Sequence, residues 1–476
     1  MQNVRVRFAP SPTGPLHMGG VRTALYNYLF AKKHGGTFIV RIEDTDQKRY
    51  VVNAEQYIMD SLKWCGIEPD ESSNNPGEVG PYRQSERKAM YQEYAELLVS
   101  KGWAYYAFDD EESIASKRTA AEAEGEKWQY DASSRKQMRN SETLEKEEVE
   151  QLLSASTKWV IRFKMPASEE INFSDLIRGD VSFNSAVLDD KVLMKGDGMP
   201  TYHLANIVDD HLMKISHVIR GEEWLPSAPL HQMLYKAFGW DAPQFAHLPL
   251  ILKPTGNGKL SKRDGEKGGF PVFPLNWADP NSGDLLTGYR ESGYTPAAFL
   301  NMLLMLGWNP GTEQEIFSLE QAIETFELER VVKAGARFNP DKAKWFNEQH
   351  LRLTDHSILA EQLKELFSGE GKSITSEQSS AIVKMLIDRV SFLHEMLGED
   401  YLFESPSEFD AKTVKKKWKE QTPGIILELK EELAKAGSWE AGQIEGVFKA
   451  FLERKELGFG AVLPGFRLML SGKGGG

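Results

Sequence analysis

The sequence predicts an α/β protein built on a doubly wound parallel sheet, with an α+β insertion and an all-α C-terminal region. Three observations support this fold class. Strand-like and helix-like segments alternate over residues 1–108 and again over 188–240. A charged stretch rich in Ala, Glu and Lys begins the segment between them, 109–187. Beyond about Leu285 helical periodicity dominates, which indicates that the C-terminal third is all-α.

The first half of the sheet domain is predicted from hydrophobic spacing. The first helix carries apolar residues at helical spacing and ends at Gly35 and Gly36, which are typical of a helix terminus. Strands are predicted over 4–9 and 37–42, and helices over 21–33, 54–64 and 86–101.

The insertion and the second half follow in the same way. Within the insertion, strand-like pieces cover 159–165 and 181–187. The alternation then resumes with strands at 191–194 and 215–220 and helices at 202–212 and 223–238, so we expect the parallel sheet to resume there. Later helices are predicted at 297–306, 319–326, 381–397 and 424–436.

Composition excludes several classes of protein. Of the 476 residues, 41% are hydrophobic and 27% charged, as in ordinary globular proteins. The longest apolar stretches, such as 302–306, are too short to span a bilayer, and the N-terminus lacks a secretory signal, so we expect a cytoplasmic protein. A single cysteine, Cys65, excludes internal disulfides and Cys-rich metal clusters.

The net charge of −13 argues only weakly against a nucleic-acid partner, because phosphate binding needs a local basic face. Lys412, Lys415, Lys416, Lys417 and Lys419 provide one local excess. A solvated helix face is the more common reason for such a run.

Two common motifs are incomplete in this chain. The segment 371–373 ends like a phosphate-binding Walker A loop, but Leu366 occupies the position of the required earlier glycine. His394 and Glu395 begin a zinc-protease pattern, yet Gly398 stands where the second histidine is needed. No metal site is therefore predicted.

The strongest signal is the segment 10–20, PSPTGPLHMGG, which joins a strand directly to a helix. Its prolines and glycines favour a tight turn that lets a ligand lie against bare backbone. The positive helix N-terminus and His17 suit the oxygens of a triphosphate. This pattern indicates a nucleotide site, although such turns are often only structural.

A second signal is the glycine-flanked segment 256–265, GNGKLSKRDG, with three cations in five positions. A mobile loop of this kind can close over a pyrophosphate and neutralise its charge as it leaves.

These two segments resemble the HIGH and KMSKS signatures of class I aminoacyl-tRNA synthetases. The likeness extends to other segments, which together resemble the bacterial-type glutamate–tRNA ligases over nearly the whole chain. They are RFAPSPTG at 7–14, RIEDTD at 41–46, GPYRQSE at 80–86, TYHLANIVDD at 201–210 and VIRGEEW at 218–224.

The resemblance implies that the chain ligates L-glutamate to tRNA(Glu) through a glutamyl-adenylate, with ATP as substrate and Mg²⁺ on the phosphates. It implies a Rossmann-like catalytic domain divided by an acceptor-end-binding insertion, a stem-contact region over 241–335 and an anticodon-binding region over 336–476. Relatives are usually monomers, so a monomer is expected. No protein nucleophile is needed, because positioning and cations suffice for this chemistry.

By the same resemblance, the catalytic residues are His17, Lys259 and Lys262. The implied ATP-binding residues are Pro10, Ser11, Thr13, Gly14, His17, Gly19, Gly20, Lys259, Leu260, Ser261, Lys262 and Arg263. Those implied for glutamate are Arg7, Ser11, Glu43, Tyr202, Asn206, Arg220 and Trp224. Arginine forks suit carboxylates, and an acidic side chain suits the ammonium group.

The chain departs from the wider pattern in places. Gly20 replaces the final histidine of HIGH, and Leu260 and Arg263 replace two positions of KMSKS, as is common in this branch. The insertion has no cysteines, so no structural zinc is expected. The chain stops soon after 464–471, where relatives typically continue.

Alternatives stay open at this point. A glutamine–tRNA ligase, or a relative that charges glutamate onto modified bases, is disfavoured by the all-α C-terminal region. A non-catalytic, tRNA-binding homologue is disfavoured by intact His17, Gly19, Lys259 and Lys262.

Overall fold

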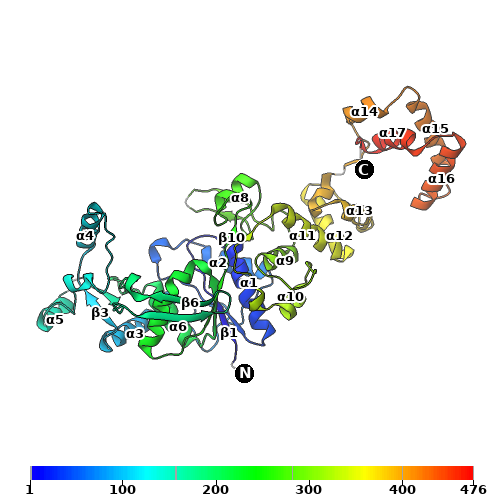
Figure 1. Ribbon diagram of the computed structural model, residues 1–476. Coiled ribbons are helices and arrows are strands. Elements are labelled where there is room, and N and C mark those ends of the chain that lie inside the picture. The colour runs from blue at the N-terminus through cyan, green and yellow to red at the C-terminus, as the bar shows by residue number, and fades with distance from the viewer. Residues whose placement is uncertain (1–2, 156–157, 281, 399, 475–476) are drawn as a thin grey trace. The chain divides into compact units, whose positions relative to one another are not determined.

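The computed structural model describes residues 3–155, 158–280, 282–398 and 400–474 (Figure 1). The chain divides into two compact units, Met1–Leu353 and Thr354–Gly476. The helix over 340–353, which sequence analysis groups with the C-terminal region, lies in the first unit.

The first unit contains the parallel strands that the alternation predicts. β1 (Arg5–Phe8) pairs with β2 (Thr37–Val40), and β8 (His217–Gly221) pairs with β9 (Gln244–Leu248), both in parallel. The Ser216 N–H donates to the Arg5 carbonyl at 2.9 Å, which joins the two halves side by side. The doubly wound arrangement is thus confirmed. Its helices are α1 (Met18–Lys33), α2 (Ala54–Trp64), α3 (Lys88–Ser100), α6 (Tyr202–Leu212) and α7 (Ala228–Phe238).

These strands form because their apolar side chains are covered on both faces. Val6, Phe38, Val218 and Ile219 are all fully buried, as expected for a parallel sheet between helices. Burial of such side chains contributes about 1.5–3 kcal/mol each.

The insertion is α+β, but the strand after it does not resume the parallel sheet. β7 (Val192–Met194) instead pairs antiparallel with β4 (Val160–Phe163), which also pairs antiparallel with β3 (Ala104–Ala107). A three-residue strand has too little periodicity to specify its partner, so this part of the sequence prediction is wrong. The remaining elements are α4 (Glu111–Ala123), α5 (Lys146–Ser154), β5 (Glu170–Asp175) and β6 (Gly179–Asn184). β5 reaches the core sheet, where Asp175 pairs with Phe245 of β9.

Two predicted helices are divided. The segment predicted as one helix over 223–238 is a 3-10 helix, Glu222–Ser227, followed by α7, because Pro226 and Pro229 cannot donate backbone hydrogen bonds. The helix predicted over 381–397 is α13 (Ser376–Leu386), followed by 3-10 helices at Ile387–Arg389 and Leu393–Gly398. A Thr375–Gln378 capping box starts α13 earlier than the periodicity indicates.

The rest of the first unit surrounds the sheet with short elements. They are β10 (Ile251–Leu252), α8 (Lys262–Gly268), β11 (Trp277–Ala278), β12 (Leu285–Leu286), α9 (Pro296–Met305), α10 (Leu319–Thr325), β13 (Ala336–Arg337) and α11 (Pro340–Leu353).

The second unit is helical throughout its described residues, as predicted. Its helices are α12 (His356–Gly369), α13, α14 (Ala411–Lys417), α15 (Thr422–Ala434), α16 (Ala441–Arg454) and α17 (Phe459–Ser471). The last three share a core that includes Leu429, Phe451 and Val462. No helix in the described part of the chain is long and apolar enough to cross a membrane.

Candidate active site

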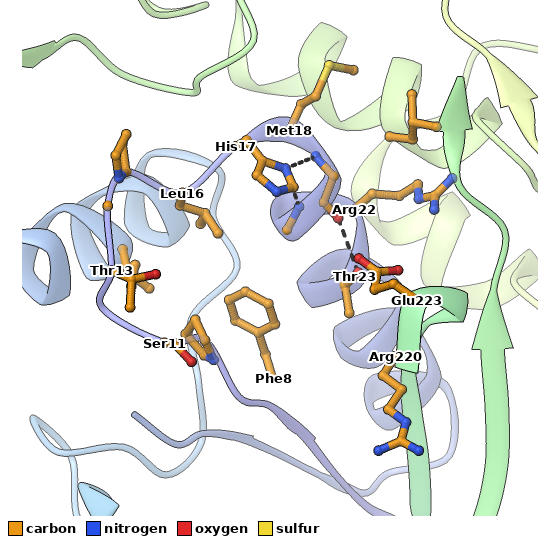
Figure 2. A pocket seen from close by; sticks show the side chains of 18 of the residues that line it. Phe8, Ser11, Thr13, Leu16, His17, Met18, Arg22, Thr23, Arg220 and Glu223 are labelled. Atoms are coloured by element: carbon orange, nitrogen blue, oxygen red, sulfur yellow. Dashed lines mark hydrogen bonds between the residues drawn. The ribbon is translucent and has the colours of Figure 1, made fainter. Parts of the chain in front are cut away.

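A cavity of about 550 Å³ lies where β1 and β8 end and α1 begins (Figure 2). The carboxyl ends of parallel strands are the usual ligand position in doubly wound sheets. All the site residues that the sequence predicts line this cavity except Arg263. They are Arg7, Pro10, Ser11, Thr13, Gly14, His17, Gly19, Gly20, Glu43, Tyr202, Asn206, Arg220, Trp224, Lys259, Leu260, Ser261 and Lys262.

His17 caps the N-terminus of α1 at the cavity wall. Its Nδ1 accepts the backbone N–H groups of Gly19 at 3.0 Å and Gly20 at 3.2 Å (Figure 2). The proton of the neutral ring must therefore sit on Nε2, which remains as a donor toward a ligand. Desolvation by the surrounding walls and the charge of Lys259 lower the pKa of His17, which keeps the ring neutral near pH 7.

Packing against Leu16 explains why position 20 holds a glycine. A Cβ there would lie 2.4 Å from Cδ1 of Leu16, whose side chain is buried against the turn. At Gly19 a Cβ would lie 3.0 Å from the His17 ring. A histidine at this fourth position would have to displace the Leu16 side chain, so packing of the turn favours glycine there.

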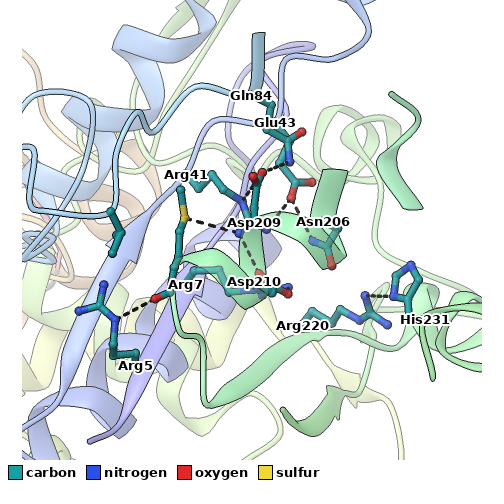
Figure 3. Close-up of polar contacts among 12 residues, drawn as sticks. Arg5, Arg7, Arg41, Glu43, Gln84, Asn206, Asp209, Asp210, Arg220 and His231 are labelled. Atoms are coloured by element: carbon teal, nitrogen blue, oxygen red, sulfur yellow. Dashed lines mark hydrogen bonds and ion pairs between the residues drawn. The ribbon is translucent and has the colours of Figure 1, made fainter. Parts of the chain in front are cut away.

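A buried ion network connects Arg7 to Glu43 beneath the cavity (Figure 3). Arg7 donates from Nε to Asp210 Oδ1 at 3.0 Å, and Arg41 donates from Nη1 to the same oxygen at 2.8 Å. Arg41 also donates from Nη2 to Glu43 Oε1 at 3.0 Å. Burial disfavours the charged form of Asp210, but the two arginines outweigh burial and hold its pKa below the usual value.

Glu43 reaches the cavity from the loop after β2. Its Oε1 also accepts from Asn206 Nδ2 at 3.1 Å, so the carboxylate is held from two sides. Burial raises the pKa of Glu43, although Arg41 and Arg7 oppose the rise. The Oδ1 atom of Asn206 is buried and has no hydrogen-bond partner within the described residues, so an acceptor remains for a ligand.

Tyr202 and Trp224 form an aromatic wall. Their ring centroids lie 4.2 Å apart, and the Tyr202 hydroxyl accepts from Arg220 Nη1 at 2.9 Å. Trp224 is 40% exposed and contributes its face at the mouth of the cavity. The wall is apolar on one side and polar at the hydroxyl, which suits an amino acid.

The predicted cationic loop also lines the cavity. Lys259 Nζ is 2.9 Å from Glu223 Oε1, and Lys262 is the first residue of α8. Ser261 caps α8 in a capping box with Asp264. Arg263 follows on α8, is exposed and does not line the cavity.

Sequence reasoning missed several polar residues. Glu223 lines the cavity and pairs with Lys259, although it stands inside the quoted segment 218–224. Asp210, His231 and His247 lie behind the wall and hold its arginines. The adjacent carboxylates Asp209 and Asp210 after apolar Ile207 and Val208 are a signal that was available, because buried acids require partners.

Metal ligands do not gather in this region. Within the described ranges, no group of three or more His, Cys, Asp or Glu side chains could hold a metal ion.

A parallel sheet with a helix-capping histidine and a lysine loop facing it defines a class I tRNA synthetase catalytic domain. Residues 3–345 match the family model of the class I tRNA synthetases (E and Q), catalytic domain, and residues 358–476 match an anticodon binding domain.

The chain is similar to named relatives over nearly its whole length. The chain is 55% identical to a glutamate–tRNA ligase of Christiangramia forsetii, covering 98% of this chain and 93% of that protein. It is 53% identical to one of Bacteroides fragilis, covering 100% and 94%. A crystal structure of a glutamate tRNA ligase from Elizabethkingia meningosepticum, in complex with its amino acid, superposes with a TM-score of 0.96 at 51% identity, covering 99% and 94%. The chain belongs to the glutamate–tRNA ligase family of class I synthetases.

Proposed function

We propose that this protein attaches L-glutamate to tRNA(Glu) in two steps that consume ATP. The observation that supports this best is the single cavity that combines an arginine- and glutamate-lined pocket with a helix N-terminus and a lysine loop. Full-length similarity to proteins named glutamate–tRNA ligase supports the same activity.

In the first step, the α-carboxylate of glutamate attacks the α-phosphorus of ATP and pyrophosphate leaves, which gives glutamyl-adenylate. His17 Nε2–H would donate to a phosphate oxygen, and the positive end of the α1 dipole would attract the phosphates. Lys259 and Lys262 would stabilise the charge that grows on the leaving pyrophosphate. Mg²⁺ would arrive on the triphosphate, since the described residues offer no preassembled metal cluster.

Before ATP binds, Lys259 is engaged with Glu223. A triphosphate carries more negative charge than one carboxylate, so the lysine is expected to exchange partners when the nucleotide enters. Glu223 thus holds Lys259 near the cavity. Breaking this ion pair costs little free energy, because both side chains are partly exposed.

In the second step, a terminal ribose hydroxyl of tRNA attacks the activated carbonyl and AMP leaves. Glu43 would hold the ammonium group, while Arg7 and Arg220 would hold carboxylates. The helical second unit would read the anticodon, and its exposed lysines on α14 are available for RNA phosphates. A monomeric state and a cytoplasmic location stay predictions.

Pyrophosphate exchange into ATP tests this function, measured with glutamate or glutamine, each with and without tRNA. We expect exchange with glutamate. Its appearance only with tRNA present would show in addition that activation depends on bound tRNA. Exchange with glutamine and not with glutamate would indicate that the protein is a glutamine–tRNA ligase instead. No exchange from folded protein would favour a non-catalytic tRNA-binding role.

A further inference from the structure

The two arginines of the amino-acid pocket have different electrostatic surroundings. Arg7 forms an ion pair with Asp210 at 3.0 Å. Arg220 is equally buried but forms no ion pair with any carboxylate among the described residues. A buried guanidinium without a counter-ion is costly unless a ligand supplies one.

Neutral acceptors take the place of a carboxylate around Arg220. Its Nε donates to His247 Nε2 at 3.0 Å. Its Nη1 contacts His231 Nδ1 at 3.2 Å, as Figure 3 shows. The Tyr202 hydroxyl accepts from Nη1 at 2.9 Å, and the Trp224 carbonyl lies 3.4 Å from Nη2. These contacts orient the guanidinium without cancelling its charge.

The geometry determines the proton positions on the histidines. Arginine can only donate, so His247 Nε2 and His231 Nδ1 must each present a lone pair. His247 Nδ1 then donates to Asp175 Oδ2 at 2.6 Å. His231 Nε2 donates onward to His203 Nδ1 at 3.2 Å, so all three rings are neutral.

Asp175 fixes this arrangement from behind. Its Oδ1 accepts the backbone N–H groups of Ile177 at 3.0 Å and Arg178 at 2.8 Å, which holds the carboxylate in place. Its Oδ2 therefore selects the Nδ1–H tautomer of His247. In the opposite tautomer, the Nε2–H group of His247 would point at the Nε–H group of Arg220, and this hydrogen bond could not form.

We propose that His203, His231 and His247, with Asp175 behind them, are positioning residues that hold Arg220 through neutral acceptors alone and so reserve its positive charge for a carboxylate of the substrate. This inference rests on the proposed function, in which Arg220 contacts the amino acid. Neutral imidazoles supply orientation, whereas a carboxylate there would compete with the substrate for the same charge.

Two substitutions of His231 distinguish the effect of a negative charge at this position from the effect of side-chain shape. His231→Asn keeps a neutral acceptor near the position of Nδ1, whereas His231→Asp puts a carboxylate there. We expect the KM for glutamate in pyrophosphate exchange to be at least about tenfold higher in H231D than in H231N, because close opposite charges couple strongly in a buried site. The KM for ATP should be the same in both variants.

If H231D does not fold, a second pair of variants tests whether His247 positions Arg220. His247→Leu removes the acceptor, while His247→Gln restores an amide oxygen near the position of Nε2. We expect H247L to raise the KM for glutamate about tenfold and H247Q to recover most of that loss, since a hydrogen bond to a charged group is at stake. Thermal unfolding of each variant verifies the fold.

The outcomes are distinct. Equal glutamate KM values within each pair, or a parallel rise in the KM for ATP, would overturn the positioning role while the wild-type enzyme stays active with glutamate. Absence of glutamate-dependent exchange in the wild type would instead overturn the proposed function. Nitrogen-15 NMR of the histidine rings gives an independent check, because a proton on Nε2 of His247 would contradict the inference.

Discussion

Lys262 is the residue on which the proposed chemistry depends most directly. It begins α8, lines the cavity and carries a charge that no carboxylate of the described residues neutralises by an ion pair. Because charge grows on the pyrophosphate as it leaves, a free cation is worth more in the transition state than in the ground state.

We expect Lys262→Ala to reduce pyrophosphate exchange by roughly 100-fold or more, with little change in thermal unfolding, because the side chain is exposed. Lys267→Ala is the matched control, since Lys267 is exposed on the same helix and does not line the cavity. Equal activity of the two variants would remove Lys262 from the mechanism.

The histidines behind Arg220 also make folding stability depend on pH. Desolvation, aided by Lys191 and Arg220, lowers the pKa of His203 from 6.5 to about 4. As the pH falls below 6.5, His203 binds a proton in the unfolded chain but not in the folded protein. The free energy of unfolding therefore decreases. The stabilisation is complete above this window and declines through it toward about pH 4.

We expect His203 alone to account for about 2 kcal/mol of lost stability between pH 7.5 and 5. Denaturant unfolding at both pH values, for wild type and His203→Gln, measures this contribution. A variant that loses as much stability as the wild type over that interval would show that His203 does not contribute.

At the scale of a single element, α1 depends on the glycines at its start. The turn from β1 brings Leu16 under the first helical residues, and the space that a Cβ of Gly20 would need is already filled. A larger residue at this position would therefore have to shift the Leu16 side chain.

We expect Gly20→Ala to destabilise the first unit by about 1–3 kcal/mol through overpacking. Gly446→Ala provides the contrast, because it lies within α16, has no atom within 4 Å of its added Cβ, and should stabilise its helix by about 0.5–1 kcal/mol. Denaturant unfolding measures both. A Gly20→Ala protein as stable as wild type would mean that Leu16 moves aside freely.

At the scale of the whole molecule, the chain contains two units, each with a core of its own. Residues such as Phe163 and Leu234 form a core in the first, and Leu429 and Phe451 form one in the second. The cavity proposed to bind glutamate and ATP is lined entirely by residues of the first unit.

Calorimetry should therefore resolve two unfolding transitions. Saturating glutamate and a non-hydrolysable ATP analogue should raise only one of them, by about 2.7 kcal/mol when a ligand is present at 100 times its Kd. A single transition that shifts as a whole with ligand would show that the two units unfold together.

The sequence by itself determined the fold class, the insertion, the helical C-terminal region and many of the residues that line the cavity. It did so because hydrophobic period and turn chemistry are local, and because the quoted segments are long enough to carry a resemblance. Arg263 was assigned to the site through the resemblance of its loop, and in the structure it does not line the cavity.

Only the tertiary structure decided which groups stand behind that wall. Asp175, His231 and His247 come from β5, α7 and β9, and contact Arg220 or one another only after those elements pack. It also decided that β7 joins an antiparallel sheet. The physical reason is the same in both cases: hydrogen-bond partners far apart in the chain leave no local period, so their pairing is set by packing.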